Sequence, residues 1–235
     1  MIGIIIFFAL SWVILYLSPA STDLFQWMLN NSDLLFPFSL YNGMVSQSVR
    51  PLWVFGGYTP FLELVLGFLI WLPFKNIPLT FMGYALVQSG LIFFSLTYFV
   101  GCIVGKNRKM DALILFIMAL TNLVTASGWF QSLNLQYIWY LHITTTALSM
   151  IALGLFIQFT TADPSQYQVY RVTLLKLSAV CILGVLSDAL FISQLVVPLL
   201  GLLVGMTIFS FISLRWAGLA GLSLLGSTVI GWALF

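Results

Sequence analysis

Charged residues are scarce in this sequence. Only 6% of its 235 residues are Asp, Glu, Lys or Arg, whereas 61% are hydrophobic. A soluble domain carries about 25% charged residues, so this composition excludes an ordinary soluble domain. The mean hydropathy of +1.10 and the long apolar runs indicate instead a protein that lies in a lipid bilayer.

Other shortages exclude further classes of protein. Eight Lys and Arg residues against six Asp and Glu residues give no basic field that could bind a nucleic acid. The only cysteines, Cys102 and Cys181, lie inside apolar runs, where they are typical small hydrophobic residues rather than parts of a disulfide scaffold. The sequence also lacks the HExxH, GxSxG, P-loop and DxD motifs. Function must therefore depend on a few polar residues.

Seven apolar stretches approach or exceed the length of about 20 residues that crosses a bilayer as a helix. They are 1–18, 77–105, 110–127, 137–160, 172–187, 190–214 and 216–235. An eighth stretch, 61–74, is short and bounded by Pro60 and Pro73, which is more typical of an interfacial or re-entrant helix. The sequence therefore predicts an all-α polytopic membrane protein with about seven transmembrane helices.

The positions of the cations predict the orientation, because cytoplasmic loops are enriched in Lys and Arg. If 61–74 does not cross and the N-terminus is cytoplasmic, six cations lie inside: Lys106, Arg108, Lys109, Arg171, Lys176 and Arg215. Only Arg50 and Lys75 then lie outside. If 61–74 crosses, the Lys106–Lys109 cluster moves outside and the bias disappears. We therefore expect a cytoplasmic N-terminus and an external C-terminus.

In this topology residues 19–76 form one long external loop. The loop is rich in Leu, Phe and Trp, and three of its segments can form short helices along the membrane surface. These begin near Ser21, near Asn31 and at Phe61. We see no internal repeat and no soluble domain after the last helix, and we expect a single membrane domain over residues 1–235.

Most of the ionisable residues outside the cytoplasmic clusters gather at the outer face. They are Asp23, Asp33, Glu63, Asp188, Arg50, Lys75 and the only histidine, His142, which lies one to two turns into the fourth transmembrane helix. Thr145, Thr146 and Ser149 follow His142 on one face of that helix. Ionisable groups at membrane depth are costly, so a functional role is the default hypothesis.

Each of these residues also has a structural interpretation. Asp23, Asp33 and Asp188 are placed to cap helices, and Asp111 is placed to cap the helix over 110–127. Glu63 lies where the helix dipole favours an anion. A lone histidine is more often a hydrogen-bonded interior residue than a catalyst, and a threonine stripe more often packs against another helix. Arg50 and Lys75 are equally suited to contact lipid headgroups.

Four short elements carry a resemblance to a known family. They are Asp33-Leu-Leu-Phe-Pro-Phe-Ser-Leu-Tyr41, Tyr58-Thr-Pro-Phe-Leu-Glu63, His142 early in a middle helix, and Ser187-Asp188-Ala-Leu-Phe191. Over roughly residues 1–200 the chain resembles the C-type, polytopic membrane glycosyltransferases, and among them bacterial integral-membrane proteins. It departs from their pattern at Asn42-Gly43, where a second acid is common, at Glu63, where Asp is usual, and over 128–136, which holds no acid.

The resemblance implies an enzyme of the bacterial inner membrane. Such enzymes transfer a sugar, with inversion, from a polyprenyl-phosphate-linked donor to an acceptor hydroxyl on the external side. Asp33 would act as the general base. Glu63 would position the acceptor or bind a divalent metal, which is the one candidate cofactor. His142 would orient the acid or donate a hydrogen bond to the lipid phosphate.

The same resemblance implies a substrate-binding group beside the catalytic residues. Arg50 and Lys75 would stabilise the charge that builds on the leaving phosphate. Asp188 and Tyr41 would complete the polar wall of the site. The expected partners are membrane lipid and the lipid-linked sugar.

Two other functions remain open. A non-catalytic membrane subunit of a larger complex, with a retained glycosyltransferase-like fold and protein partners, is consistent with the short chain and the missing acids. A transporter or channel component fits less well, because that class tends to show repeats and ionisable groups at the midplane.

Overall fold

The computed structural model describes residues 2–18, 41–43, 45–46, 61–126, 135–162, 167–188 and 190–234. Helices make up 92% of these residues and none of them lies in a strand, so the all-α prediction is confirmed for this part of the chain. Among the residues with described side chains, four helical segments are long and apolar enough to cross a membrane: Leu86–Val104, Thr144–Thr161, Tyr167–Ser187 and Leu214–Leu234. Shorter apolar helices cover Ile2–Leu17, Val65–Phe74 and Ile192–Ile208.

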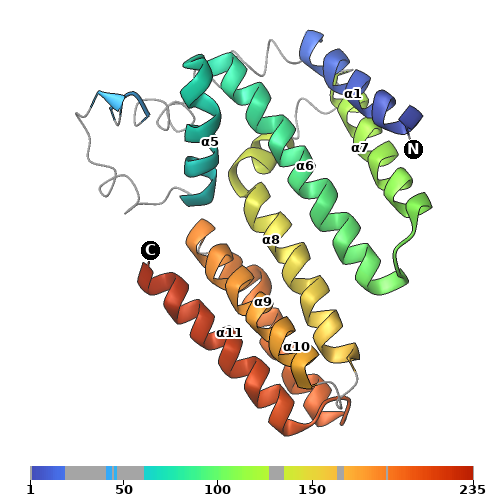
Figure 1. The fold of residues 1–235 in the computed structure, drawn as a ribbon, viewed down its shortest axis with the longest axis vertical. Coiled ribbons are helices and arrows are strands. Elements are labelled where there is room, and N and C mark those ends of the chain that lie inside the picture. Colours follow the sequence, from blue (N-terminus) through green and yellow to red (C-terminus); the bar gives the residue numbers. More distant parts are fainter. Residues whose placement is uncertain are drawn as a thin grey trace. The chain divides into compact units, whose positions relative to one another are not determined.

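The described helices follow the apolar stretches of the sequence closely (Figure 1). They are α1 (Ile2–Leu17), α5 (Phe61–Phe74), α6 (Ile77–Val104), α7 (Arg108–Ala126), α8 (Leu135–Thr161), α9 (Tyr167–Ser187), the π-helical η2 (Ile192–Val196), α10 (Val197–Ile208) and α11 (Leu214–Leu234). The stretch predicted over 190–214 ends early, because the chain turns after Ile208 and Ser210 adopts a φ of 58°.

Asparagine side chains begin two of the helices. The Asn76 Oδ1 atom accepts a hydrogen bond of 3.1 Å from the Leu79 amide at the start of α6. The Asn107 Oδ1 atom accepts one of 2.9 Å from the Lys109 amide at the start of α7. The expectation that Asp111 caps α7 is therefore wrong. Asp111 lies within the first turn, where its charge is favoured by the helix dipole.

The described chain divides into two compact units. The first comprises residues 1–57, 64–93 and 106–141, and the second comprises 58–63, 94–105 and 142–235. Helices α1 and α7 belong to the first unit, and helices α9 to α11 belong to the second.

In the first unit, α1 and α7 pack side by side and run in the same direction (Figure 1). The rings of Phe7 and Phe116 stack with their centroids 5.8 Å apart. Further along both helices, the Asn122 Nδ2 atom donates a 3.1 Å hydrogen bond to Ser11 Oγ. Residue numbers thus increase together along the contact, which defines a parallel pair.

Helix α5 turns back sharply into α6 in the same unit. Lys75, with a φ of 45°, and Asn76 form the connection. The Cγ2 atom of Ile70 lies only 2.8 Å from the position that a Cβ of Gly83 would occupy. The absence of a side chain at Gly83 therefore lets α5 lie directly against the start of α6 (Figure 1).

The second unit contains a core built mainly by α8 to α11. Its fully buried side chains include Phe159, Leu177, Phe191, Leu199 and Leu224. Helices α9 and α11 are parallel neighbours: the rings of Tyr170 and Trp216 stack 4.4 Å apart near their starts, and Val185 contacts Gly231 near their ends. The chain reverses twice between them, through α10.

Helices α6 and α8 are also parallel within this unit. Ser95 Oγ donates to Met150 Sδ at 3.7 Å, and about one turn later Tyr98 packs on Gly154. Near the ends of both helices, Gln158 Nε2 donates to Cys102 Sγ at 3.4 Å.

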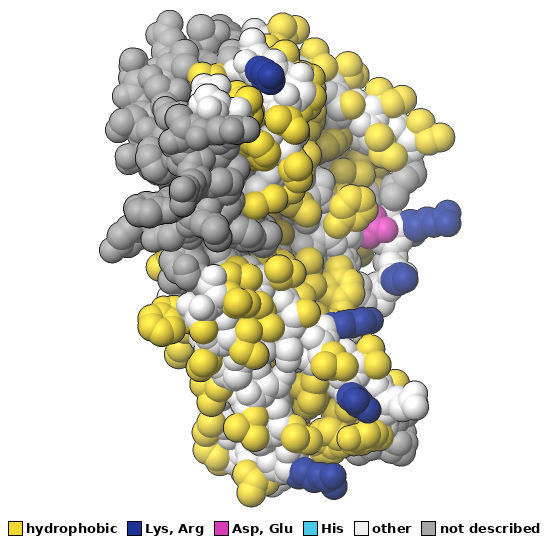
Figure 2. All heavy atoms as spheres, turned by 60° about the vertical axis from the view of Figure 1, so that its left-hand side comes forward, with side chains coloured by type: hydrophobic (Ala, Val, Ile, Leu, Met, Phe, Trp, Pro, Cys, Tyr) yellow, Lys and Arg dark blue, Asp and Glu magenta, His cyan; other side chains and the backbone are white. Residues whose placement is uncertain are grey.

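Hydrophobic side chains dominate the described surface (Figure 2). Large apolar residues are almost fully exposed at several positions, for example Leu214 at 77%, Phe211 at 76% and Leu222 at 71%. Apolar patches of this kind mark contact with lipid or with another protein, and together with the four long apolar helices they place the chain among candidate integral-membrane proteins.

Candidate functional site

The residues predicted for the site are described to different extents. Asp33 and Arg50 lie outside the described residues. Glu63 belongs to α5 and His142 to α8, but the side chains of both lie outside what the structure describes. The remaining three are Tyr41, Lys75 and Asp188, and each has a defined environment.

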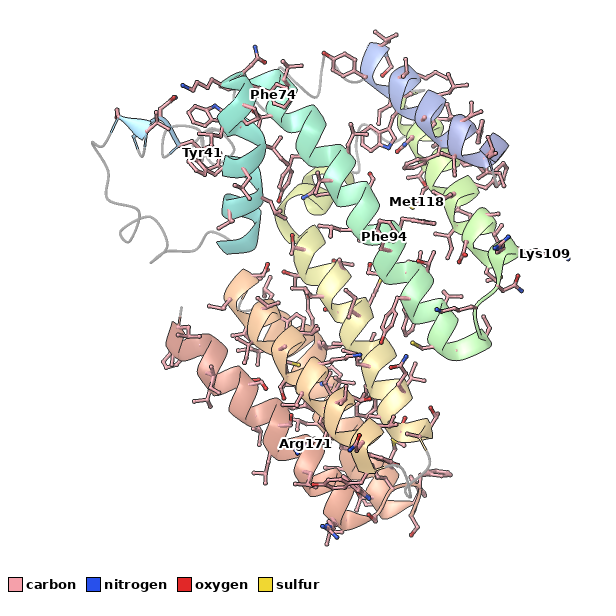
Figure 3. All side chains as sticks on the ribbon, in the orientation of Figure 1. Tyr41, Phe74, Phe94, Lys109, Met118 and Arg171 are labelled. Atoms are coloured by element: carbon pink, nitrogen blue, oxygen red, sulfur yellow. The ribbon has the colours of Figure 1, made fainter. Side chains whose placement is uncertain are left out.

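Tyr41 packs against one face of α5 (Figure 3). Its side chain is only 4% exposed, and its ring centroid lies 5.6 Å from that of Phe68 and 5.8 Å from that of Trp71. The Tyr41 hydroxyl oxygen lies 2.5 Å from the position that a Cβ of Gly67 would take. Burial raises the pKa of Tyr41 above its usual value, because desolvation disfavours the phenolate. Tyr41 is therefore a neutral phenol at physiological pH.

This contact joins the last residue of one element that carries the family resemblance to α5. The first element ends at Tyr41, and the second ends at Glu63 in the first turn of α5. Gly67 follows Glu63 by four residues, so both positions lie on the same face of the helix. The described contact is thus between Tyr41 and the part of α5 that follows Glu63.

Lys75 lies at the other end of α5 from Glu63. It is exposed and directly follows Phe74, the last residue of the helix. With a rise of about 1.5 Å per residue, α5 separates the Glu63 and Lys75 positions by about 18 Å. The structure therefore does not bring Lys75 and Glu63 together, and a lysine at this place is also suited to the negative end of the helix dipole.

Asp188 caps the helical segment that follows α9. Its Oδ1 atom accepts a 2.8 Å hydrogen bond from the Leu190 amide, and its carbonyl oxygen accepts one of 3.0 Å from the Phe191 amide. The adjacent Ser187 is fully buried. The prediction that Asp188 caps a helix is thus confirmed, since one of its carboxylate oxygens accepts a hydrogen bond from the backbone.

A pair of substitutions separates capping from chemistry at Asp188. We expect Asp188→Asn to retain stability, because Asn caps helices as well as Asp does. We expect Asp188→Ala to lower the free energy of unfolding by about 1 kcal/mol, measured by thermal unfolding of the purified protein. A loss of stability in Asp188→Asn equal to that in Asp188→Ala would show that the charge, rather than the cap, is what matters.

The polar stripe predicted on α8 is partly different from the one observed. Thr145 is completely buried and Ser149 is half-buried, so both face the protein interior. Thr146, expected in the same stripe, is exposed. Thr144 is buried at 6% exposure instead. No periodic signal in the sequence singles out Thr144, which the sequence analysis missed.

Metal binding has no support among the residues with described side chains. They contain no group of three or more His, Cys, Asp and Glu residues that could hold an ion. The candidate ligand Glu63 is outside that set, so its role toward a metal stays a prediction.

Comparison with known proteins finds no relative. No protein-family model matches the sequence, no curated protein is significantly similar to it, and no solved structure matches it significantly.

Proposed function

We propose that this chain is a seven-helix integral-membrane protein that transfers a sugar from a polyprenyl-phosphate-linked donor to an acceptor on the external side. In this proposal the N-terminus is cytoplasmic, the C-terminus is external, and α5 does not cross the membrane. The proposal has two parts, the topology and the chemistry, and different observations support each.

The parallel packing of α1 and α7 supports the topology. Two transmembrane helices run in the same direction only if the chain crosses the membrane an odd number of times between them. If α6 crosses, α5 does not. This agrees with the distribution of Lys and Arg, which favours the same topology.

The end of the second unit where α9 and α11 begin has the character of a cytoplasmic boundary. Arg171 and Arg215 are exposed there, each next in sequence to one member of the Tyr170–Trp216 stack (Figure 3). Aromatic side chains mark both membrane interfaces and cations favour the cytoplasmic one. Asp188, after the last residue of α9, lies at the opposite end of that helix.

One observation carries the chemical part of the proposal, namely the packing of Tyr41 on Gly67 of α5. It holds Tyr41, the last residue of the element that begins with Asp33, against the helix whose first turn contains Glu63. In the proposed reaction Asp33 takes the proton of the acceptor hydroxyl, and the acceptor oxygen bonds to the anomeric carbon. The bond from that carbon to the phosphate oxygen breaks, and the polyprenyl phosphate leaves. Glu63 and His142 position the acceptor and the phosphate.

A non-catalytic membrane subunit is the second candidate. The observation that favours it is the cap at Asp188, since one oxygen of that carboxylate is bonded to the local backbone. In this case the fold is retained for assembly with protein partners.

The decisive experiment is a cell-surface glycan profile by mass spectrometry in the native host. It compares the wild type, a deletion strain, Asp33→Asn, and the control Asp111→Asn, whose carboxylate lies in the first turn of α7. We expect glycans shifted by one sugar mass in the deletion and in Asp33→Asn, and a normal profile in Asp111→Asn. Loss of a general base typically lowers the rate by about 10²–10⁴-fold.

The other outcomes discriminate between the two candidates. A shift in the deletion alone, with Asp33→Asn normal at equal protein levels, would favour the non-catalytic subunit. An unchanged profile in both would contradict a role in glycan transfer.

A further inference from the structure

Hydroxyl side chains in the helices of this protein usually bond to their own helix. Thr121 Oγ1 donates to the Ile117 carbonyl at 3.0 Å, Thr207 Oγ1 to the Leu203 carbonyl at 2.7 Å, and Thr228 Oγ1 to the Leu224 carbonyl at 2.8 Å. Thr161, near the end of α8, does the same with the Ile157 carbonyl at 2.8 Å. Such bonds satisfy a hydroxyl inside a membrane without any other partner.

Three hydroxyls near the middle of α8 depart from this pattern. Within the part of the chain that the structure describes, the hydroxyl oxygens of Thr144, Thr145 and Ser149 are buried and have no hydrogen-bond partner. Thr145 is 0% exposed and Thr144 is 6% exposed. A buried hydroxyl without a partner is more costly than a satisfied hydroxyl is favourable. Three such groups within six residues of one helix are therefore hard to explain as packing alone.

The position of these hydroxyls on α8 is informative. Thr145 and Ser149 are four residues apart and share one face of the helix. Helix α8 runs from Leu135 to Thr161, so the three hydroxyls lie close to its midpoint. His142 precedes Thr145 by three residues along the same helix.

We propose that Thr144, Thr145 and Ser149 form a binding site for a neutral ligand that carries hydroxyl groups. Each of the three side chains is uncharged and can both donate and accept a hydrogen bond. The matching ligand is therefore one that also does both, either water or a sugar hydroxyl. The site does not depend on the proposed function, but a sugar as its ligand rests on that proposal.

The test begins with Thr145→Val, which removes the hydroxyl and keeps the shape of the side chain. The protein is purified in an amphipathic polymer that contains no sugar, and its thermal unfolding is followed. If the site holds water, we expect Thr145→Val and Ser149→Ala each to lower the melting temperature by about 3 °C, because a satisfied hydrogen bond is lost. The matched control, Thr161→Val, removes an exposed hydroxyl from the same helix, where solvent replaces the lost bond, and should change the melting temperature little.

A second arm identifies a sugar. Wild type and Thr145→Val are heated with methyl glycosides of glucose, galactose, mannose and N-acetylglucosamine at high concentration. If a sugar is the ligand, at least one glycoside raises the melting temperature of the wild type, and Thr145→Val loses that rise. Sorbitol at the same osmolality controls for general stabilisation by solutes.

A melting temperature that does not fall in Thr145→Val overturns the inference. Hydroxyls that bind nothing destabilise the folded protein, so without a ligand Thr145→Val raises the melting temperature or leaves it unchanged. In that case no glycoside distinguishes the variant from the wild type. The glycan profile is a separate readout. A normal profile in Asp33→Asn would contradict the proposed chemistry and leave a water site at Thr145 intact.

Discussion

We expect Gly184→Ala to destabilise the second unit severely. The ring of Phe191 lies on the backbone of α9 at this position, where an added Cβ would be 2.5 Å from Phe191 Cζ and 2.6 Å from Phe191 Cδ2. Phe191 is 0% exposed and belongs to the core, so its ring has no free space into which to rotate. Overpacking of this kind costs about 3 kcal/mol.

The measurement is thermal or denaturant unfolding of the purified protein. Gly201→Ala, in α10 of the same unit, is the matched control, because its Cβ would meet nothing within 4 Å. The double variant Gly184→Ala with Phe191→Leu should recover part of the loss, since the smaller side chain vacates the position. Equal stability of Gly184→Ala and Gly201→Ala would contradict the packing described here.

The helices were predictable because hydropathy alone marks them. In a membrane the backbone must satisfy its own hydrogen bonds, so long apolar stretches become helices whatever their details. The short length of the helix over 61–74 was also predictable, because Pro60 precedes it and Pro73 lies in its last turn. The caps were less predictable. Asn107 and Asp111 are both near the start of α7, and only the geometry of the chain decides that Asn107 provides the cap.

The candidate site was predictable only in part, because it depends on contacts between distant segments. Nothing in the pattern of the sequence indicates that Tyr41 packs on Gly67, since a glycine contributes space rather than a side chain. The helical period placed Thr145 and Ser149 on one face, as the structure shows, but it could not indicate that their hydroxyls lack partners. That property depends on which atoms the neighbouring elements present.

The second large effect is expected at Gly231, where α11 packs directly against α9. A Cβ at Gly231 would lie 2.9 Å from Val185 Cβ and 3.1 Å from the Ile182 carbonyl oxygen. The buried residues of α11 form one seam: Ala220, Leu224, Ser227 and Gly231. Small residues at such seams let helix backbones approach closely inside a membrane.

Gly231→Leu should therefore force the ends of α9 and α11 apart. A backbone carbonyl and the branched carbon of Val185 cannot rotate away, unlike the tip of a flexible side chain, so the helices themselves must move. We expect a loss of at least about 3 kcal/mol in the free energy of unfolding, measured in the same unfolding experiment.

Gly226→Leu separates this steric effect from the general cost of replacing a glycine in α11. Gly226 is exposed, and a Cβ there would meet nothing within 4 Å, so this variant should unfold like the wild type. If Gly231→Leu behaves like Gly226→Leu, the close approach of α9 and α11 is contradicted. If it is destabilised while Gly226→Leu is not, the seam of small residues holds the two parallel helices together. That result would also strengthen the assignment of a common membrane direction to both helices.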